Sequence, residues 1–283
     1  MQLAMIQDKI IPYKDLEPVY LDRGTFFGDG VYEVVRSYNG KIFVLDKHLQ
    51  RFARSVREVQ IEGIEIEDIQ SRIETAFDHA NIANAKIYFH VTRGSATRNH
   101  GFSAELKPNF FLTITELQDN KEKKLNGIKV STYPDLRWKR CDIKSLNLLP
   151  NVLARMDAEK KGCQEAILID DNGDITEGSA SAFFMVFAAG KKLVTRQLGK
   201  EILPSITRGI IEEIAPKAGL KVVEHKMTPY QAQNADELIM GVSTQDVIGI
   251  VEFDGKKIGD GKVGEYTKKL MLEFEKFVSN TAK

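Results

Sequence analysis

One lysine in this chain has the surroundings of a nucleophile. Lys144 lies in the segment 137–147 (RWKRCDIKSLN), which we expect to place it at the start of a helix. A lysine attacks a carbonyl only after losing its proton, and its ordinary pKa is about 10.4. Desolvation and nearby cations lower that pKa, so Arg137, Lys139 and Arg140 could activate it if they point inward. Such a lysine can form a Schiff base with an aldehyde; the alternative is an ordinary surface lysine.

A single carboxylate, Glu177, could assist this chemistry. It follows the turn 170–174 (DDNGD), whose alternating acidic and amide side chains are similar to a calcium-binding loop. The sixth position of that loop is Ile175, where the EF-hand pattern needs glycine, so a hairpin turn is the better interpretation. From the residues alone, Glu177 could equally be a solvated turn residue. No group of histidines and cysteines has the spacing of a metal site.

Three separate segments could bind a phosphate group. The sequence 204–209 (PSITRG) predicts a helix start with Ser205 as N-cap, and free N–H groups at such a start bind anions. Ser243 and Thr244 follow a predicted strand and offer hydroxyl and N–H groups. Arg51 belongs to a predicted amphipathic helix, and its planar guanidinium can donate two hydrogen bonds to one phosphate. An ordinary capped helix remains the alternative for 204–209.

A polar loop could recognise a carboxylate. Arg98 and His100 stand two residues apart in 94–101 (GSATRNHG), so an extended loop would point both side chains the same way. A cationic arginine beside a histidine donor can hold a carboxylate, although a flexible polar loop explains the spacing equally well. Nearby, 26–30 (FFGDG) lacks the third glycine and the strand–helix–strand context of a dinucleotide site. We interpret it as a tight backbone passage leading to Tyr32.

The first half of the chain is predicted to contain two strands, two helices and two further strands. The run 31–35 and the run 41–45 flank Asn39-Gly40, a strong hairpin signal. Apolar residues at helical spacing then predict helices around 49–56 and 69–77. The remaining predicted strands are 86–91 and 109–116.

The second half is predicted to alternate helices with strands. Helices are expected over 145–161 (bent or restarted near Pro150), over 204–218 (interrupted or ended near Pro216) and over 262–278; strands are expected over 165–169, 181–187 and 237–242. The stretch 118–127 is the most polar and predicts a linker. We therefore expect a mixed α+β protein with an N-terminal domain over 1–117, this linker, and a C-terminal domain over 128–283.

The composition excludes several classes of protein. Hydrophobic residues make up 42% and charged residues 28% of 283 residues, which is typical of a globular protein. Lys+Arg and Asp+Glu are both 40, so no basic excess favours nucleic-acid binding. No apolar run is long enough to cross a bilayer, and no signal peptide is expected at the N-terminus. Cys141 and Cys163 are too few for a disulfide framework, and we expect reduced thiols in a cytoplasmic protein.

Several motifs, in the same order, resemble those of D-amino acid transaminases, which are pyridoxal-phosphate enzymes of fold type IV. The resemblance runs over nearly the whole chain and is carried by 22–35, 91–94 (VTRG), 98–100 (RNH), 137–147, 176–179 (TEGS), 206–208 (ITR) and 259–265 (GDGKVGE). It implies two domains with pyridoxal 5'-phosphate between them, and a transaminase that acts on D-alanine and 2-oxoglutarate in two half-reactions.

The resemblance also implies a role for each candidate residue. Lys144 would hold the cofactor as a Schiff base and move the proton of the substrate α-carbon, while Glu177 would face the pyridine nitrogen. The phosphate would be bound by Arg51, Ile206 (through its N–H), Thr207, and Ser243 or Thr244. The α-carboxylate would be held by Tyr32, Arg98 and His100, with the loop of the last two coming from the neighbouring subunit of a homodimer.

Two positions differ from the better-known relatives, and three different functions stay open. Ala180 replaces a serine and Ala182 an asparagine; loss of one hydrogen bond, worth ~1 kcal/mol, should alter cofactor electronics or retention without abolishing the reaction. A branched-chain L-amino acid transaminase would share Lys144, Glu177 and Arg51 without needing Arg98 and His100. An aminodeoxychorismate lyase on the same fold and a binding protein without activity stay open as well.

Overall fold

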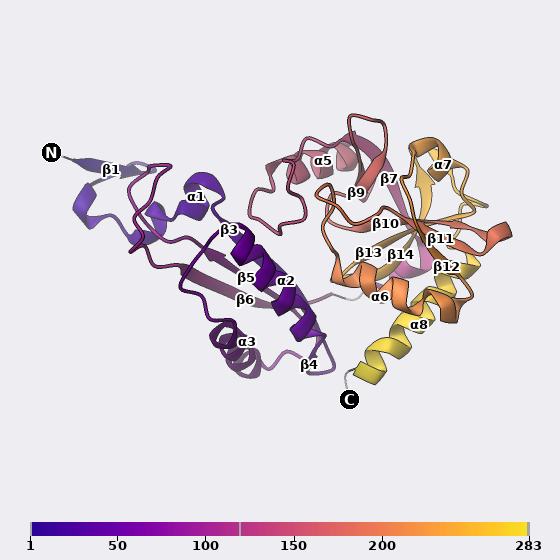
Figure 1. Cartoon of the computed structure of the whole chain (residues 1–283), viewed down its shortest axis with the longest axis horizontal. Coiled ribbons are helices and arrows are strands. Elements are labelled where there is room, and N and C mark those ends of the chain that lie inside the picture. Colours follow the sequence, from indigo (N-terminus) through magenta and orange to yellow (C-terminus); the bar gives the residue numbers. More distant parts are fainter. Residues whose placement is uncertain (1, 119, 282–283) are drawn as a thin grey trace.

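The chain forms two domains, each built around its own sheet. The computed structural model describes residues 2–118 and 120–281. Within them, an N-terminal four-stranded sheet and a C-terminal nine-stranded sheet lie side by side (Figure 1). Helices pack on both sheets, so the predicted mixed α+β class is confirmed. None of the described helices is long and apolar enough to span a membrane.

The N-terminal sheet has the predicted order of elements. Its strands are antiparallel in the order β4-β3-β5-β6, and two helices follow β4. The bounds are β3 (Gly30–Tyr38), β4 (Lys41–Ile42), α2 (Leu45–Glu58), α3 (Ile66–Ala80), β5 (Ala85–Thr92) and β6 (Asn109–Glu116). The hairpin signal is confirmed, because Asn39 (φ 50°) and Gly40 (φ 82°) both take the left-handed conformation of a tight hairpin turn. β4 is shorter than predicted, since α2 begins at Leu45.

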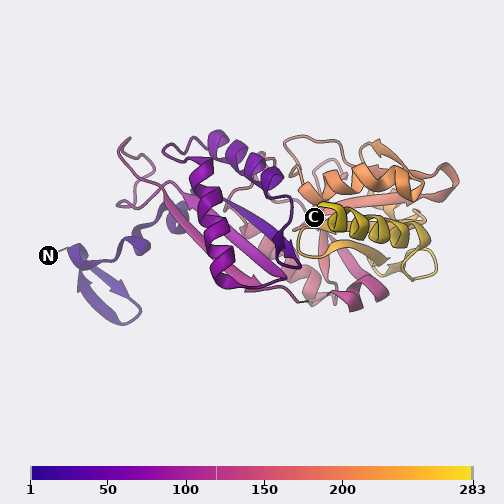
Figure 2. The same cartoon turned by 90° about the horizontal axis from the view of Figure 1, so that it is seen from below.

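A small hairpin precedes this sheet and was not predicted. β1 (Leu3–Ile6) and β2 (Lys9–Pro12) pair with each other and project away from the body of the chain (Figure 2). They are joined to β3 by η1 (Tyr13–Asp15), η2 (Pro18–Leu21) and α1 (Arg23–Phe27). Gly28 ends α1 at φ 64°, which a residue without a side chain adopts at low cost.

The polar stretch between the sheets contains a short helix, α4 (Lys121–Asn126). β6 ends at Glu116 and β7 begins at Ile128, so the elements change sheet across this stretch. We therefore propose the division into 1–117, 118–127 and 128–283.

The C-terminal sheet is mixed and curls on itself. Its path runs β12-β11-β10-β13-β14-β7-β8-β9, with β15 paired to β14, and β9 comes into contact with β10. The bounds are β7 (Ile128–Pro134), β8 (Glu165–Ile169), β9 (Ile175–Gly178), β10 (Ala182–Phe187), β11 (Lys192–Thr195), β12 (Lys221–Glu224), β13 (Glu237–Val242), β14 (Asp246–Phe253) and β15 (Lys256–Lys257). Fully buried side chains such as Phe183, Met185 and Phe253 fill the inside of the curl.

Helices cover the outside of this sheet. α6 (Ile206–Ile214) and α8 (Glu265–Thr281) pack on β13 and β14, and α5 (Leu149–Lys160) packs on β7 and β8. A 3-10 helix, η3 (Ala188–Gly190), precedes β11, and another, η4 (Ala215–Ala218), follows α6 at Pro216, where the sequence predicted an end. α7 (Pro229–Gln233) begins with a capping box made by Thr228 and Gln231.

The expected helix over 145–161 begins four residues late, and this changes the setting of Lys144. α5 starts at Leu149 with Pro150 in its first turn. A helix starting at Ser145 would place Pro150 in its interior, where the ring clashes with the carbonyl four residues earlier. Lys144 is therefore held in an irregular segment instead of at a helix start.

Candidate active site

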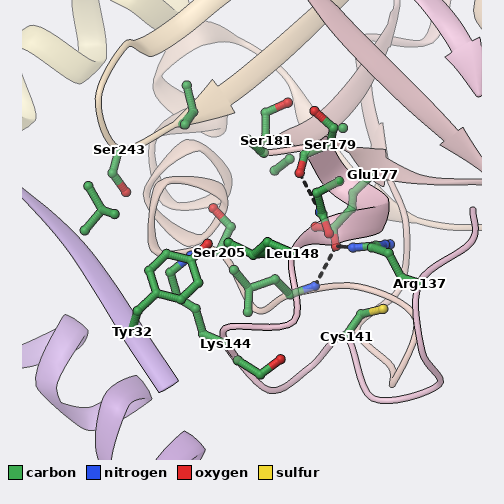
Figure 3. Close-up of a pocket in the computed structure, with 18 of the residues that line it drawn as sticks. Tyr32, Arg137, Cys141, Lys144, Leu148, Glu177, Ser179, Ser181, Ser205 and Ser243 are labelled. Atoms are coloured by element: carbon green, nitrogen blue, oxygen red, sulfur yellow. Dashed lines mark hydrogen bonds and ion pairs between the residues drawn. The ribbon is translucent and has the colours of Figure 1, made fainter. Parts of the chain in front are cut away.

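Both domains line one cavity of about 280 Å³. Tyr32 and Arg51 come from the N-terminal domain, and Lys144 comes from the segment just before α5. From the C-terminal sheet and its loops the cavity receives Glu177, Ser179, Ala180, Ser181, Ala182, Ser205, Ser243 and Thr244. Figure 3 shows Glu177 and Ser243 on opposite sides of this lining. The structure thus gathers most of the predicted site residues around one cavity.

Lys144 is fixed through its backbone to the N-terminal domain. The Tyr32 N–H donates to the Lys144 carbonyl (3.0 Å), and the Lys144 N–H donates to Ser55 Oγ (3.2 Å). Its Nζ lies 4.1 Å from the centroid of the Tyr32 ring, which favours a cation there. The two backbone hydrogen bonds therefore fix the position of the Lys144 main chain, and Lys144 lines the cavity.

Two of the three cations that could have activated Lys144, Arg137 and Arg140, are paired with carboxylates. Arg140 donates to Asp142 (2.9 Å) and to Glu58 (2.5 Å), and Arg54 donates to Asp142 from the other side (2.5 Å). These ion pairs fix the turn before Lys144. Arg140, which could activate Lys144 if it pointed inward, instead directs its guanidinium to Asp142 and Glu58.

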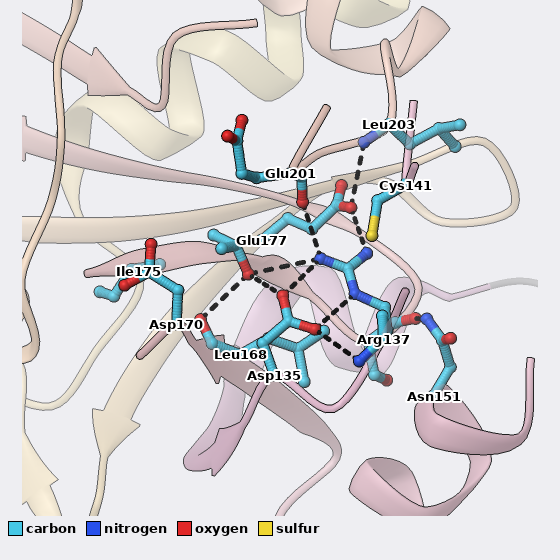
Figure 4. Close-up of polar contacts among 12 residues, drawn as sticks. Asp135, Arg137, Cys141, Asn151, Leu168, Asp170, Ile175, Glu177, Glu201 and Leu203 are labelled. Atoms are coloured by element: carbon cyan, nitrogen blue, oxygen red, sulfur yellow. Dashed lines mark hydrogen bonds and ion pairs between the residues drawn. The ribbon is translucent and has the colours of Figure 1, made fainter. Parts of the chain in front are cut away.

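Arg137, another of these cations, forms ion pairs with Glu177 and Asp135. Its Nη1 donates to Glu177 Oε1 (2.5 Å), while Nε and Nη2 grip Asp135 at 2.9 and 2.7 Å (Figure 4). The Leu203 N–H also donates to Glu177 Oε1 (3.0 Å). Both hydrogen bonds to Glu177 use Oε1, so Oε2 remains for a group in the cavity.

The charge of Glu177 is incompletely balanced. The side chain is buried, and this burial raises the pKa of its carboxyl although Arg137 acts in the opposite direction. Arg137 divides its positive charge between Asp135 and Glu177. A second cation in the cavity would therefore favour the ionised form of Glu177.

The start of α6 lies at one end of the site and has the groups that bind an anion. Ser205 is the N-cap, and its hydroxyl accepts from the Arg208 N–H (3.2 Å), as predicted. The N–H groups of Ile206 and Thr207 belong to the first turn, where a helix offers them no partner of its own. Thr207 Oγ1 lies 3.4 Å from Ser243 Oγ, which joins this turn to the loop that lines the cavity. Such an arrangement suits a phosphate.

Arg51 reaches the same end and is oriented by a buried carboxylate. Its Nε and Nη2 donate to the two oxygens of Glu33 (2.7 and 2.8 Å), and Nη1 donates to the Pro204 carbonyl (3.0 Å). These bonds use three of the five N–H donors of a guanidinium, which leaves two for an anion. Burial favours a neutral Glu33, but Arg51 and His48 hold the pKa of its carboxyl far below the ordinary value.

Glu165 holds two serines that line the cavity, Ser179 and Ser181. This buried carboxylate accepts from the hydroxyls of Ser179 and Ser181 (the latter at 3.1 Å) and from the Ala166 N–H. Both hydroxyls thus have a partner in the protein. Ala180 lies between these serines in the sequence and lines the cavity. It replaces a serine of the better-known relatives, so no hydroxyl is present at this place.

Arg98 and His100 do not line the cavity of Lys144 in the same chain. The Arg98 guanidinium lies 5.3 Å from the centroid of the Phe27 ring, and the His100 ring lies 5.3 Å from the same ring. The Arg23 guanidinium donates to the carbonyls of Asn99 (2.6 Å) and His100 (3.1 Å), which fixes the loop. Of the three residues expected to hold a carboxylate, only Tyr32 lies at this cavity.

Three supporting residues, Glu33, Asp135 and Glu165, were missed by reasoning from the sequence. Each accepts a hydrogen bond from a residue well removed in the chain: Arg51 is 18 positions from Glu33, Thr176 is 41 from Asp135, and Ser181 is 16 from Glu165. Glu33 had one usable signal, because an acid within the apolar run 31–35 is buried at a cost unless it is paired.

The chain matches relatives over its full length. The family model described as Amino-transferase class IV matches residues 30–253. The D-alanine aminotransferase of Staphylococcus haemolyticus is 37% identical over 284 residues, covering 99% of each chain; that of Staphylococcus epidermidis is 36% identical over 283 residues, again covering 99% of each.

A solved structure agrees with this fold. The branched-chain amino acid aminotransferase of Escherichia coli superposes with a TM-score of 0.86 at 22% identity, covering 98% of this chain and 94% of the other. This likeness speaks for the architecture of two domains around the cavity. With the family model and the relatives above, it leads to one conclusion. The chain is a member of the class IV aminotransferase family.

Proposed function

We propose that this aminotransferase moves the amino group of D-alanine to 2-oxoglutarate with pyridoxal 5'-phosphate, in a ping-pong mechanism. The observation that carries the proposal is the cavity in which Lys144 and Glu177 meet an anion-binding helix start. The full-length relatives named as D-alanine aminotransferases support D-alanine as the donor.

The residues of the cavity fit the cofactor at both ends. Oε2 of Glu177 and its incompletely balanced charge suit a protonated ring nitrogen. The first turn of α6, the free donors of Arg51, and Ser243 or Thr244 suit the phosphate. Lys144 would hold the aldehyde carbon. When bound, pyridoxal phosphate supplies an aldehyde that takes the amino group and a ring that accepts the electron pair of the α-carbon.

The side chains of the protein then have separate tasks. The Lys144 amine, once freed by the substrate, takes the proton from the α-carbon and returns it at the end of the half-reaction. Glu177 would place its carboxylate beside the ring nitrogen, and its negative charge would stabilise charge that develops during proton removal. Tyr32 packs against Lys144 and limits where its amine can lie.

We further propose that the α-carboxylate is held by Tyr32 together with Arg98 and His100 of a second subunit. Arg98 and His100 lie apart from Lys144 within one chain, which is the expected geometry if they serve a neighbouring cavity. α5, directly after Lys144, carries an exposed apolar stripe at helical spacing, formed by Leu149, Val152, Leu153 and Met156. Such a stripe would be covered in a homodimer.

Where the carboxylate is held decides which enantiomer reacts. Fixing it at Tyr32, Arg98 and His100 determines which face of the α-carbon turns its hydrogen toward Lys144. This feature distinguishes the proposed reaction from a branched-chain L-amino acid transaminase, which would not need the pair. An aminodeoxychorismate lyase would release pyruvate without any oxo-acid acceptor.

The visible absorption of the purified holoenzyme tests the proposal. We expect D-alanine alone, without an acceptor, to remove the band of the bound cofactor. Loss of the band with L-leucine but not with D-alanine would favour the branched-chain reaction. A protein that gains no band when incubated with pyridoxal phosphate would contradict the proposed role of Lys144.

Mixing subunits tests the shared site. Arg98→Ala with His100→Ala in one chain should mainly raise the KM for the amino acid, and Lys144→Ala should abolish turnover. After unfolding and refolding together, the two variants should regain activity at low D-alanine, because one site of each mixed dimer is complete. If the mixture is no more active than its two parts, the loop serves its own subunit.

We also propose a cytoplasmic location. Cys141 and Cys163 are both free thiols, which accords with a reducing compartment.

A further inference from the structure

The turn that lines the cavity with Ser243 and Thr244 ends in an unusual residue. Asp246 opens β14 with a left-handed backbone (φ 63°) and is 4% exposed. A buried carboxylate is costly unless cations or hydrogen-bond donors surround it. Its partners therefore indicate what Asp246 does.

Three donors converge on Asp246, and none of them belongs to the C-terminal sheet. Arg36 Nη1 (2.8 Å) and Tyr38 Oη (2.5 Å) donate from β3 of the N-terminal domain. Lys124 Nζ donates from α4 in the linker (2.7 Å). The guanidinium of Arg36 also stacks 4.3 Å from the centroid of the Tyr38 ring. One carboxylate thus joins both domains and the linker.

The same elements also donate hydrogen bonds to the turn itself. The Thr244 carbonyl accepts from Asn120 Nδ2 (3.0 Å) and from Arg36 Nη1 (3.4 Å). The Gln245 side chain accepts from Lys123 Nζ (3.3 Å). Held by these hydrogen bonds, the turn lines the cavity with Ser243 and Thr244.

We propose that Asp246 is a positioning residue that holds the Ser243–Thr244 turn in the shape that binds the cofactor phosphate. This inference rests on the proposed function, since it takes the ligand of the turn to be the phosphate of pyridoxal phosphate. It goes further by making phosphate affinity depend on contacts from β3 and α4. Residues that do not touch the phosphate would then set how firmly the cofactor is retained.

The negative charge of Asp246 is the essential property. A carboxylate can accept from Arg36, Tyr38 and Lys124 at once, because it has acceptor sites on both oxygens. The amide of asparagine has only one oxygen, and its NH₂ group would face a cation. Asparagine tolerates the left-handed backbone as well as aspartate does, so Asp246→Asn changes the charge and keeps the backbone preference.

The chain offers a matched control at the other end of the same strand. Asp254 follows β14, also has a left-handed backbone (φ 49°), and accepts from Thr132 N and Oγ1 at 2.7 and 2.9 Å. It does not line the cavity described above. Asp254→Asn therefore repeats the chemical change without touching the turn.

The experiment measures the affinity of the cofactor-free protein for two ligands, by absorbance or fluorescence titration. Pyridoxal 5'-phosphate and pyridoxal differ only in the phosphate. We expect Asp246→Asn to weaken binding of pyridoxal phosphate about tenfold or more and to leave binding of pyridoxal unchanged. Asp254→Asn should leave both affinities as in the natural sequence.

A second variant covers the case in which Asp246→Asn does not fold. Tyr38→Phe keeps the ring and removes one donor, so it should give a smaller loss, again only for pyridoxal phosphate. Equal losses for both ligands, or no loss for either, would overturn the inference while the proposed function stands. If the natural sequence binds neither ligand, the proposed function fails first and the inference falls with it.

Discussion

Lys144 and Tyr32 are joined twice, by a backbone hydrogen bond of 3.0 Å and by the contact of the Lys144 Nζ with the Tyr32 ring at 4.1 Å from its centroid. The first contact fixes the main chain and the second restricts the side chain. The two residues lie in different domains, so the position of the amine proposed to react depends on how the domains meet. This pair therefore links the fold to the chemistry proposed for it.

Lys144→Ala should abolish transamination and the visible band of the bound cofactor, because no other amine replaces Nζ at the Tyr32 ring. The measurement is the D-alanine half-reaction together with an absorption spectrum of the purified variant. Lys139→Ala is the matched control, since Lys139 lies in the same segment and is exposed. Near-normal turnover by Lys144→Ala would sink the mechanism.

Glu177→Gln should lower kcat by about tenfold to a hundredfold, the worth of a hydrogen bond to a charged group. The amide cannot supply the negative charge that favours a protonated ring nitrogen. A change in the visible spectrum of the bound cofactor should accompany the loss. Glu201→Gln serves as control, because its side chain is exposed and points away from Arg137 in Figure 4. An unchanged rate and spectrum would exclude Glu177 from this role.

Lowering the pH should destabilise the protein in two steps, the first involving His48 and the second involving Glu33. Burial lowers the pKa of His48, so the unfolded chain takes up its proton first and stability falls as the pH drops below about 6.5. The pKa of Glu33 is also lowered, by Arg51 and His48 against the effect of burial. Its contribution is present above about pH 4.3 and is lost below that pH.

Urea unfolding at a series of pH values measures both steps. Glu33→Gln should lower the free energy of unfolding at pH 7 by about 3 kcal/mol, since it leaves Arg51 buried without its partner. His48→Gln should reduce the decline that begins near pH 6.5, to which His90 also contributes because burial lowers its pKa, and should keep the decline at lower pH. A His48→Gln variant with the full natural decline would refute the assignment to His48.

Cys141 should resist alkylation although it lines the cavity. Burial raises the pKa of its thiol to about 12, so very little reactive thiolate is present at pH 8. We expect iodoacetamide to leave the native protein unmodified and to label both cysteines in urea, as followed by mass spectrometry. Rapid labelling of the folded protein at Cys141 would contradict this.

The strongly periodic elements could be predicted from the sequence, and some strands could not. The Asn39-Gly40 turn and the apolar spacing in α2 and α3 identified their elements, because local chemistry decides them. β14 was missed, since Gly249 interrupts its apolar run. The structure explains that glycine: a Cβ there would lie 3.1 Å from Val263, just before α8, and 3.3 Å from Thr267 of α8, so its absence lets α8 approach the sheet.

Some residues of the candidate site could also be predicted from the sequence, and others could not. Residues with distinctive motifs, such as Lys144 and Glu177, could be proposed from the sequence together with a family resemblance. The residues that hold them could not, because their partners are distant in the chain. Asp246 is 210 positions from Arg36, and no local pattern indicates that contact.

The attachment of Lys144 to β3 has a consequence for how the protein is made. β4 pairs only with the C-terminal end of β3, at Ser37 and Tyr38. At the N-terminal end of β3, Val31 forms a bridge with Ser145, and the Leu146 N–H donates to the Gly30 carbonyl. While the chain leaves the ribosome, this strand edge has no neighbour until residue 146 has emerged. An uncovered edge can pair with other chains. The exposed edge of β3 in a nascent chain could thus pair with other chains until the segment that carries Lys144 covers it.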